Sequence, residues 1–232
     1  MEYKIEPIAV IHNEFKSKFG IPRQSGLDED TISTIVFEKK YRDENALRGL
    51  SQYSHIWLLW IFSENEVNKE WSPTVRPPRL GGNKRMGVFS TRSPYHPNNI
   101  GLSCVKIESI EKIQGLGSVI KVSGADILDG TPIIDIKPYL TLSDCKPDAV
   151  CGFSDEVKDK KLDVIIEEKF SAEIPEETLS AIISMLSQDP RPSYHDDKSR
   201  IYAMNYSDYE IKFTVNGDTL TVISIFKTNG CE

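Results

Sequence analysis

The chain has 232 residues, of which 39% are hydrophobic and 27% charged, and its formal net charge is −7. This length suits one large domain, or a larger domain followed by a smaller one. No apolar run approaches the roughly 18–20 residues of a membrane-spanning helix, and the first residues lack a signal-peptide layout, so we expect a cytoplasmic protein with no membrane partner.

The charge is distributed unevenly. Residues 1–140 carry 18 Lys and Arg against 17 Asp and Glu, a net of +1, whereas residues 141–232 carry 10 against 18, a net of −8. The window from Trp71 to Ile107 has no acidic residue, and its cations are Arg76, Arg79, Lys84, Arg85, Arg92 and Lys106. Such a strip can meet a phosphate backbone although the average charge is acidic. The alternative is a solvated loop that lacks acids by chance.

In chain order, the first 123 residues show mostly strand and loop patterns. They predict a strand at 3–11, a structured loop at 13–30, a strand at 31–37 and a short helix at 43–50. A strand buried on both faces is predicted at 55–62, followed by a weak helix at 65–70 and an extended basic loop at 73–82. Residues 101–113 and 119–123 are predicted to form a hairpin. Gly115 and Gly117 form the turn of that hairpin. A strand follows them, whereas a dinucleotide-binding fingerprint requires a helix there.

The rest of the chain predicts a linker at 140–161, an amphipathic helix at 176–187, and a hairpin of 209–215 with 219–226 across an Asn-Gly turn. The apolar face of the helix is expected to be Leu179, Ile182, Ile183 and Leu186. The alternating strand–helix pattern of a doubly wound sheet is missing. We therefore predict a mainly β domain over 1–140 and a small α+β domain over 141–232.

Two dense polar segments, 89–103 and 126–139, favour a small-molecule site, because Pro and Gly fix loop shapes in which polar side chains can reach a ligand. Arg92 suits a carboxylate or a phosphate. Asp126 and Asp129 suit ribose hydroxyls or an ammonium group, although the Asp-Gly pair at 129–130 can also be a plain turn.

A third polar segment, residues 189–195, follows the predicted helix and holds Arg191, Tyr194 and His195. This composition suits single-stranded nucleic acid. A hydrolase is disfavoured because Ser103 lacks a nucleophile elbow. A metal site is disfavoured because the four cysteines form no CxxC pair and the four histidines are scattered.

At these residues the chain resembles the TrmO family of tRNA methyltransferases. The matching segments occur in family order and are residues 18–27, 53–57, 87–103, 126–132, 135–139 and 189–194. The resemblance implies an antiparallel β-barrel of about seven strands that binds S-adenosylmethionine without a Rossmann fold. It also implies a homodimer and methylation of N6 of N6-threonylcarbamoyladenosine, next to the anticodon of tRNA.

The resemblance further implies which residues hold the cofactor, namely Pro22, Arg23, Gln24, His55, Ile56, Arg92, Leu102, Ile127, Leu128, Asp129 and Gly130. Tyr95, His96 and Asn99 depart from the family pattern, which puts substrate preference in question.

As a mechanistic hypothesis, a carboxylate or a tyrosine accepts the proton of the attacking nitrogen, and the candidates are Asp126, Asp189 and Tyr194. The cations expected at the anticodon stem-loop or the threonyl carboxylate are Arg76, Arg79, Arg85, Lys137 and Arg191. Two alternatives stay open: a cofactor-binding or RNA-binding module without activity, and a methyltransferase for another modified nucleoside.

Overall fold

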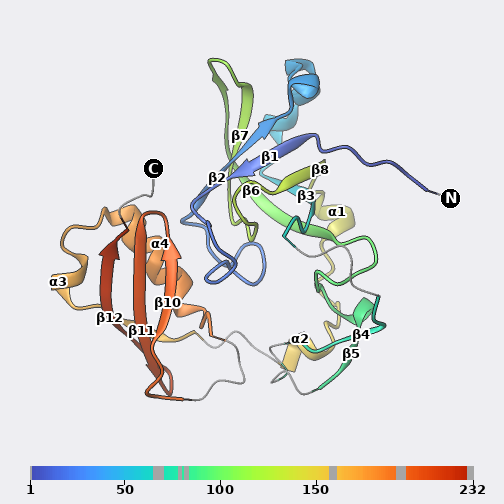
Figure 1. Ribbon diagram of the computed structural model, residues 1–232. Helices are drawn as coiled ribbons and strands as arrows, with labels where there is room; N and C mark the ends of the chain where they lie inside the picture. Colours follow the sequence, from blue (N-terminus) through green and yellow to red (C-terminus); the bar gives the residue numbers. More distant parts are fainter. Residues whose placement is uncertain are drawn as a thin grey trace.

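The computed structural model describes residues 2–64, 71–77, 80, 84–156, 161–191 and 197–228, and its described part is mainly β (Figure 1). The strands of the first part are β1 (Ala9–His12), β2 (Ile32–Phe37), β3 (His55–Ile61), β4 (Thr74–Val75), β5 (Met86–Gly87), β6 (Ile100–Ile113), β7 (Gly117–Ser123) and β8 (Pro132–Pro138). The later elements are α1 (Thr141–Asp144), α2 (Phe153–Glu156), β9 (Asp163–Ile165), α3 (Glu168–Ser171), α4 (Glu176–Ser187), β10 (Tyr202–Tyr206), β11 (Tyr209–Asn216) and β12 (Thr219–Lys227).

Six antiparallel strands of the described chain close into a barrel in the order β1-β2-β7-β6-β3-β8, and β8 pairs back onto β1. Because the barrel is closed, each of these strands has a hydrogen-bonded neighbour on both sides and none is an edge strand. β3 lies between β6 and β8, with Trp60 opposite Gly101 of β6. β4 and β5 form a separate two-stranded ribbon outside the barrel.

The burial of β3 corrects one prediction. Ile56, Leu58 and Trp60 are buried inside the barrel, while the residues between them are only partly covered. The strand is therefore buried on one face, because successive side chains of a strand point to opposite sides. Its continuous apolar run does not mean two buried faces here.

The second part is a four-stranded sheet in the order β10-β11-β12-β9, in which β9 runs parallel to β12. Helix α4 contributes Ala181, Ile182, Met185 and Leu186 to the core of this part. The predicted helix bounds are confirmed, but Ile183 is 40% exposed, so the buried face is rotated from the predicted one.

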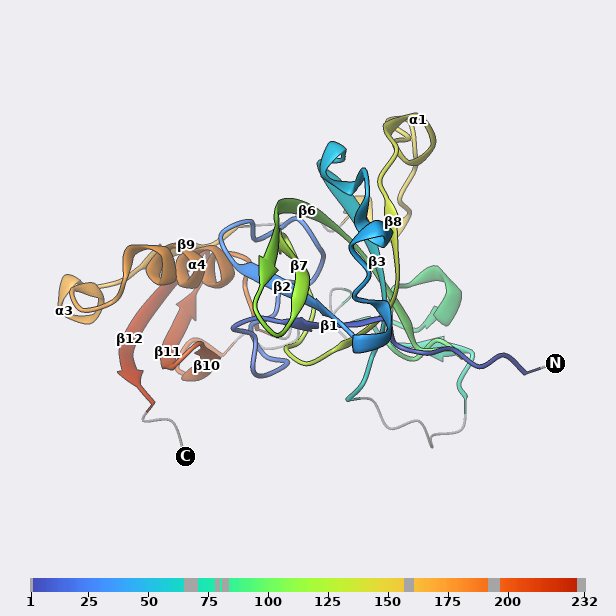
Figure 2. The same ribbon diagram turned by 90° about the horizontal axis from the view of Figure 1, so that it is seen from above.

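The loop of residues 13–31 connects β1 to β2 of the barrel. It lies between the barrel and the second sheet in both views (Figure 1, Figure 2). Phe15 belongs to the core of the second part although it follows β1 of the barrel. Gly20 has φ +98°, and a Cβ there would lie 2.5 Å from Sδ of Met204 on β10. The glycine therefore allows both the turn and the close approach of the loop to the second sheet.

Polar contacts fasten the same loop to the second part. Thr31 Oγ1 lies 3.0 Å from the hydroxyl of Tyr206, and Ser180 Oγ donates to Asp30 Oδ2 at 2.9 Å. Gln188 Nε2 donates to the carbonyl of Leu27 at 3.1 Å. The 13–31 loop thus helps to hold the barrel and the second sheet together.

The β2 strand, the 101–113/119–123 hairpin and the 209–215/219–226 hairpin agree with the sequence patterns. The predicted strand at 3–11 is real only over β1, and the predicted helix at 43–50 is replaced by 3₁₀ turns at Glu44–Leu47 and Leu50–Gln52. The sequence patterns missed β8, β9 and β10, and the linker contains α1 and α2. The weak helix at 65–70 lies outside the described residues. Among the described residues, no helix is long and apolar enough to cross a membrane.

Candidate active site

A cavity of about 450 Å³ opens at one end of the barrel. This volume lies within the range of roughly 300–1,000 Å³ typical of small-molecule and cofactor sites. The lining residues come from the 13–31 loop, the end of β3, the first polar segment, the start of β6 and the second polar segment. They include Lys18, Pro22, Arg23, Gln24, Trp60, Phe62, Thr91, Arg92, His96, Gly101, Leu102, Asp126, Leu128 and Thr131. The fold therefore brings residues of the two polar segments together at one cavity.

Asp126 is the acidic group best placed for chemistry in the cavity. Its Oδ1 accepts a hydrogen bond of 2.5 Å from Ser103 Oγ, which in turn accepts one of 2.9 Å from Trp60 Nε1. Burial raises the pKa of Asp126, although the Ser103 hydroxyl and the charge of Arg92 act in the opposite direction. A carboxyl group with a perturbed pKa at a cavity wall is a candidate for proton transfer.

Arg92 supplies positive charge at the cavity wall. Its Nη1 donates to Gln24 Oε1 at 2.8 Å, and this contact joins the first polar segment to the 13–31 loop. The guanidinium fork has further donors to offer, which suits recognition of a planar carboxylate. Arg92 and Asp126 thus place opposite charges in one cavity.

Arg23 holds the segment after helix α4 beside the barrel. The Nη2 of Arg23 donates to the backbone carbonyls of both Asp189 and Arg191, each at 2.6 Å. The carboxylate of Asp189 accepts from Arg191 Nε at 2.8 Å and from its Nη2 at 2.9 Å. Asp189 and Arg191 therefore form a bidentate pair that is largely covered, which fixes both side chains in the geometry of that pair.

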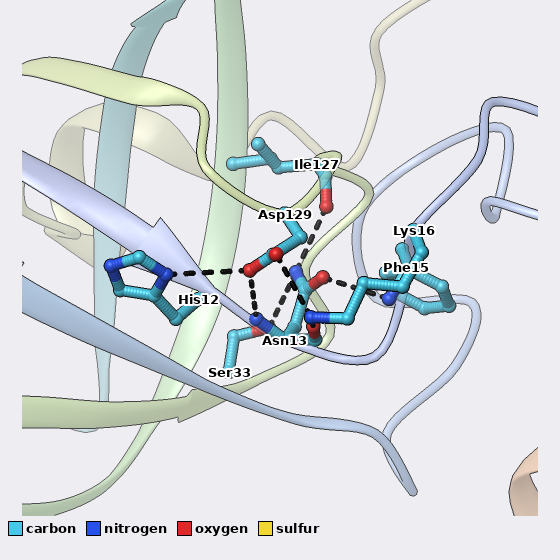
Figure 3. Close-up of polar contacts among 7 residues, drawn as sticks. All are labelled: His12, Asn13, Phe15, Lys16, Ser33, Ile127 and Asp129. Carbon is cyan, nitrogen blue, oxygen red and sulfur yellow. Dashed lines mark hydrogen bonds and ion pairs between the residues drawn. The ribbon is translucent and has the colours of Figure 1, made fainter. Parts of the chain in front are cut away.

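Asp129 does not line the cavity but contacts residues at the end of β1 and the start of the 13–31 loop (Figure 3). It pairs with Lys16 Nζ at 2.8 Å and lies 3.4 Å from His12 Nδ1, while the N–H of Asn13 donates to it at 3.0 Å. Burial raises its pKa, but the Lys16 and Asn13 contacts outweigh burial, and the pKa is lowered overall. Asp129 therefore fastens the second polar segment to the start of the 13–31 loop.

Other predicted residues do not line this cavity. Ile56 and Ile127 are buried in the barrel core, His55 Nδ1 contacts Ser54 Oγ at 2.9 Å, and Gly130 occupies a turn with φ +76°. Lys137 pairs with Asp135 on β8. The functional roles of these five residues stay predictions.

Among the predicted tRNA contacts, Arg76 and Arg85 are exposed on or beside the β4–β5 ribbon, and Arg85 Nη1 donates to Thr74 Oγ1 at 3.1 Å. Arg79 and Tyr194 lie outside the described residues. Within the described part, no group of three or more His, Cys, Asp or Glu side chains is arranged for a metal ion.

The sequence patterns missed several residues of the site, notably Trp60 and Ser103, which orient Asp126. Trp60 was hidden in an apolar run that predicts core. A usable signal existed, because a buried indole N–H requires an acceptor, and Ser103 can supply one. The pairing of β3 with β6, which brings these side chains together, is a tertiary feature.

Gly101 is required by the packing of Trp60. A Cβ built on Gly101 would lie 2.2 Å from Cε2 of the Trp60 indole. We expect Gly101→Ala to destabilise the protein by about 1–3 kcal/mol, the usual cost of overpacking, as a lower midpoint of thermal unfolding. Gly87→Ala is the matched control, because a Cβ there meets only Ser90 Oγ, at 3.7 Å. Equal midpoints for the two variants would show that the indole moves aside freely.

Comparison with known proteins places the chain in the class of tRNA-modifying methyltransferases. Residues 10–145 match the tRNA-methyltransferase O N-terminal domain, and residues 159–228 match the TrmO C-terminal domain. The chain is 34% identical over 235 residues to the tRNA (adenine(37)-N6)-methyltransferase of Escherichia coli (strain K12), which covers 96% of this chain and 97% of that protein. The protein of the same name from Eikenella corrodens is 41% identical over 179 residues, covering 77% of this chain and 99% of its own.

The structural comparison agrees with these matches. A crystal structure of TrmO from Pseudomonas aeruginosa superposes with a TM-score of 0.80 at 30% sequence identity, covering 98% of each chain. The chain therefore belongs to the TrmO family of tRNA methyltransferases, and the resemblance that its polar segments indicated is confirmed.

Proposed function

We propose that the protein transfers a methyl group from S-adenosylmethionine to N6 of N6-threonylcarbamoyladenosine, next to the anticodon of tRNA. The observation that carries the proposal is the cavity that Asp126 and Arg92 line together with apolar residues. Relatives at high coverage are named tRNA (adenine(37)-N6)-methyltransferases, and two from P. aeruginosa are named as S-adenosylmethionine-dependent methyltransferases.

The cavity residues fit the cofactor in kind. Arg92 suits the carboxylate of its methionine part. Leu102, Leu128 and Phe62 offer apolar contact for the adenine and the carbon chain, and Pro22 and Gln24 close the wall from the 13–31 loop. When bound, the cofactor supplies an electrophilic methyl group on a sulfonium.

The protein's own task is then to position, desolvate and deprotonate. The attacking nitrogen belongs to a urea-like group and is a poor nucleophile while it carries its proton. We assign Asp126 as the group that accepts this proton, with Ser103 and Trp60 as its positioning residues. Asp189 is held in its pair with Arg191, so we rank it below Asp126 as a proton acceptor.

We propose that Arg76, Arg79 and Arg85 contact the phosphates of the anticodon stem-loop. The target base lies in a loop, so little pairing energy opposes its exposure. We also propose that the chain acts as a homodimer and that residues 1–140 and 141–232 are its two domains. These two points follow from the family resemblance and the sequence.

The test is incubation with S-adenosylmethionine and tRNA that carries threonylcarbamoyladenosine, followed by mass spectrometry of the digested nucleosides. We expect a gain of one methyl group on that nucleoside and no gain with tRNA lacking the modification. Methylation of the unmodified tRNA at the same rate would refute the proposed substrate, and cofactor binding without any turnover would favour a binding module.

A further inference from the structure

We propose that Phe89 and Trp71 form a stacking surface for unpaired bases of the RNA substrate. Phe89 contacts His96, which lines the cavity, and Trp71 contacts Phe89. We call Trp71, Phe89 and His96 together the aromatic row. The inference rests on the proposed tRNA substrate class and goes beyond it, because it names where nucleotides next to the target base would lie.

The aromatic row is continuous and starts at the cavity. His96 lines the cavity, and its ring centroid lies 5.6 Å from that of Phe89 in an edge-to-face arrangement. The centroid of Phe89 lies 6.5 Å from that of Trp71. A base that stacked on Phe89 would thus be a neighbour of a base held in the cavity.

Both outer rings of the row are exposed to solvent. Phe89 is 73% exposed and Trp71 is 54% exposed. Exposed apolar surface that is gathered in one place marks an interaction site more often than single exposed residues do. Planar aromatic faces are the usual partners of splayed nucleotides, since every base has a face that can stack.

The backbone below Phe89 is anchored, so the ring is presented without a large ordering cost. The preceding residue, Val88, is 1% exposed, and its N–H donates to the carbonyl of Pro73 at 2.9 Å. Its carbonyl accepts both the N–H of Thr91 at 3.1 Å and the hydroxyl of Thr91 at 2.7 Å. This closes a 3₁₀ turn at Val88–Ser90, from which Phe89 points away from the core.

The inner ring is also fixed. His96 Nε2 lies 2.9 Å from the carbonyl of Thr91, and because a carbonyl only accepts, Nε2 carries the proton of this bond. The imidazole therefore keeps one orientation between Phe89 and the cavity.

The charge of the segment that carries the row favours RNA as the occupant. No acidic residue occurs between Trp71 and Ile107 in the sequence, and Arg76, Arg85 and Arg92 lie in that window. Cations beside stacking rings are the combination that proteins use for single strands, where the cations follow the backbone and the rings take the bases. An apolar protein partner would not require the cations.

The experiment compares Phe89→Ala with wild type, using a fluorescently labelled, unmodified anticodon stem-loop and a fully paired RNA hairpin stem of the same length. We expect stem-loop affinity to fall about tenfold, the lower part of the usual range for one lost stack. Duplex affinity, the salt dependence of binding and cofactor affinity should stay unchanged. Phe89→Tyr should retain stem-loop affinity, because the ring is retained.

Phe226→Ala is the matched control, since Phe226 is also exposed but lies on β12 of the second sheet. A second readout is the tryptophan emission of the protein, which the stem-loop should quench less in Trp71→Phe than in wild type.

Unchanged stem-loop affinity in Phe89→Ala would overturn the inference, and so would equal losses for stem-loop and duplex. A shift of Phe89→Ala toward a smaller oligomer would instead assign the row to a contact between copies of the chain. The binding assay uses unmodified RNA and no turnover, so failure of the proposed methylation would not be mistaken for failure of the stacking surface.

Discussion

Replacing Asp126 by Asn should lower the turnover number for tRNA methylation by about 10²–10⁴-fold, the range expected when a general base is lost. The affinity for S-adenosylmethionine should change little. The amide retains the size of the carboxyl group and can still accept from Ser103 Oγ, but it cannot take up the proton of the substrate nitrogen. Single-turnover kinetics together with calorimetric titration of the cofactor separate the two effects.

Two control measurements, thermal unfolding and cofactor affinity, distinguish loss of the base from other effects of the substitution. The pKa of Asp126 is raised by burial, so its charged form costs free energy in the folded protein. The Asp126→Asn variant should therefore unfold at the same or a higher temperature at pH 7, and a lower midpoint would point to a structural loss. A large loss of cofactor affinity with the chemical step unchanged would make Asp126 a cofactor ligand and remove it as the base.

The pH dependence follows with a definite sign. The base is active only when it is deprotonated, so the rate should rise with pH through the raised pKa of Asp126. In the wild type, the hydrogen bond from the Ser103 hydroxyl stabilises the carboxylate and keeps the pKa of Asp126 lower than burial alone would make it. The Ser103→Ala variant lacks this donor. The rising limb of the rate should then move to higher pH in Ser103→Ala. A limb that stays in place would mean that Asp126 is not the group that titrates.

Arg92→Ala should weaken S-adenosylmethionine binding by about 10- to 100-fold. Hydrogen bonds to a charged group contribute roughly 1.5–3 kcal/mol, and about 1.4 kcal/mol corresponds to a factor of ten. The variant also loses the contact of Arg92 Nη1 with Gln24 Oε1, which holds one wall of the cavity. Equilibrium dialysis with labelled cofactor measures the effect directly.

Arg85→Ala is the matched control for Arg92→Ala. Arg85 belongs to the same acid-free strip, but it does not line the cavity. We expect it to leave cofactor affinity unchanged and to weaken tRNA binding with a smaller salt dependence, as loss of one phosphate contact does. If Arg92→Ala behaved like Arg85→Ala, Arg92 would belong to the phosphate contacts and not to the cofactor site.

Local patterns in the amino-acid sequence were sufficient for the elements whose signals are short-range. The Gly115–Gly117 hairpin, the Asn-Gly hairpin and helix α4 were predictable because turn glycines and helical periodicity act within a few residues. The family was recognisable from the polar segments, because fixed loop shapes around a ligand require particular residues at particular spacings.

Which of those residues meet depends on long-range pairing. β8 was hidden in a segment that its polar residues marked as a loop, yet β8 closes the barrel by pairing with both β3 and β1. The barrel also places Trp60 against Gly101 and brings Ser103 to Asp126, contacts between residues too far apart in the chain for any local pattern to show.

The same reason explains Asp129 and Arg191. Both are charged residues in polar segments, so the sequence favours a ligand for each. In the fold, Asp129 meets Lys16 and His12, and Arg191 meets Asp189, because a partly covered charge is stabilised by the nearest opposite charge. The sequence specifies which side chains can carry charge, but only their three-dimensional neighbours determine whether that charge holds the fold together or faces a ligand.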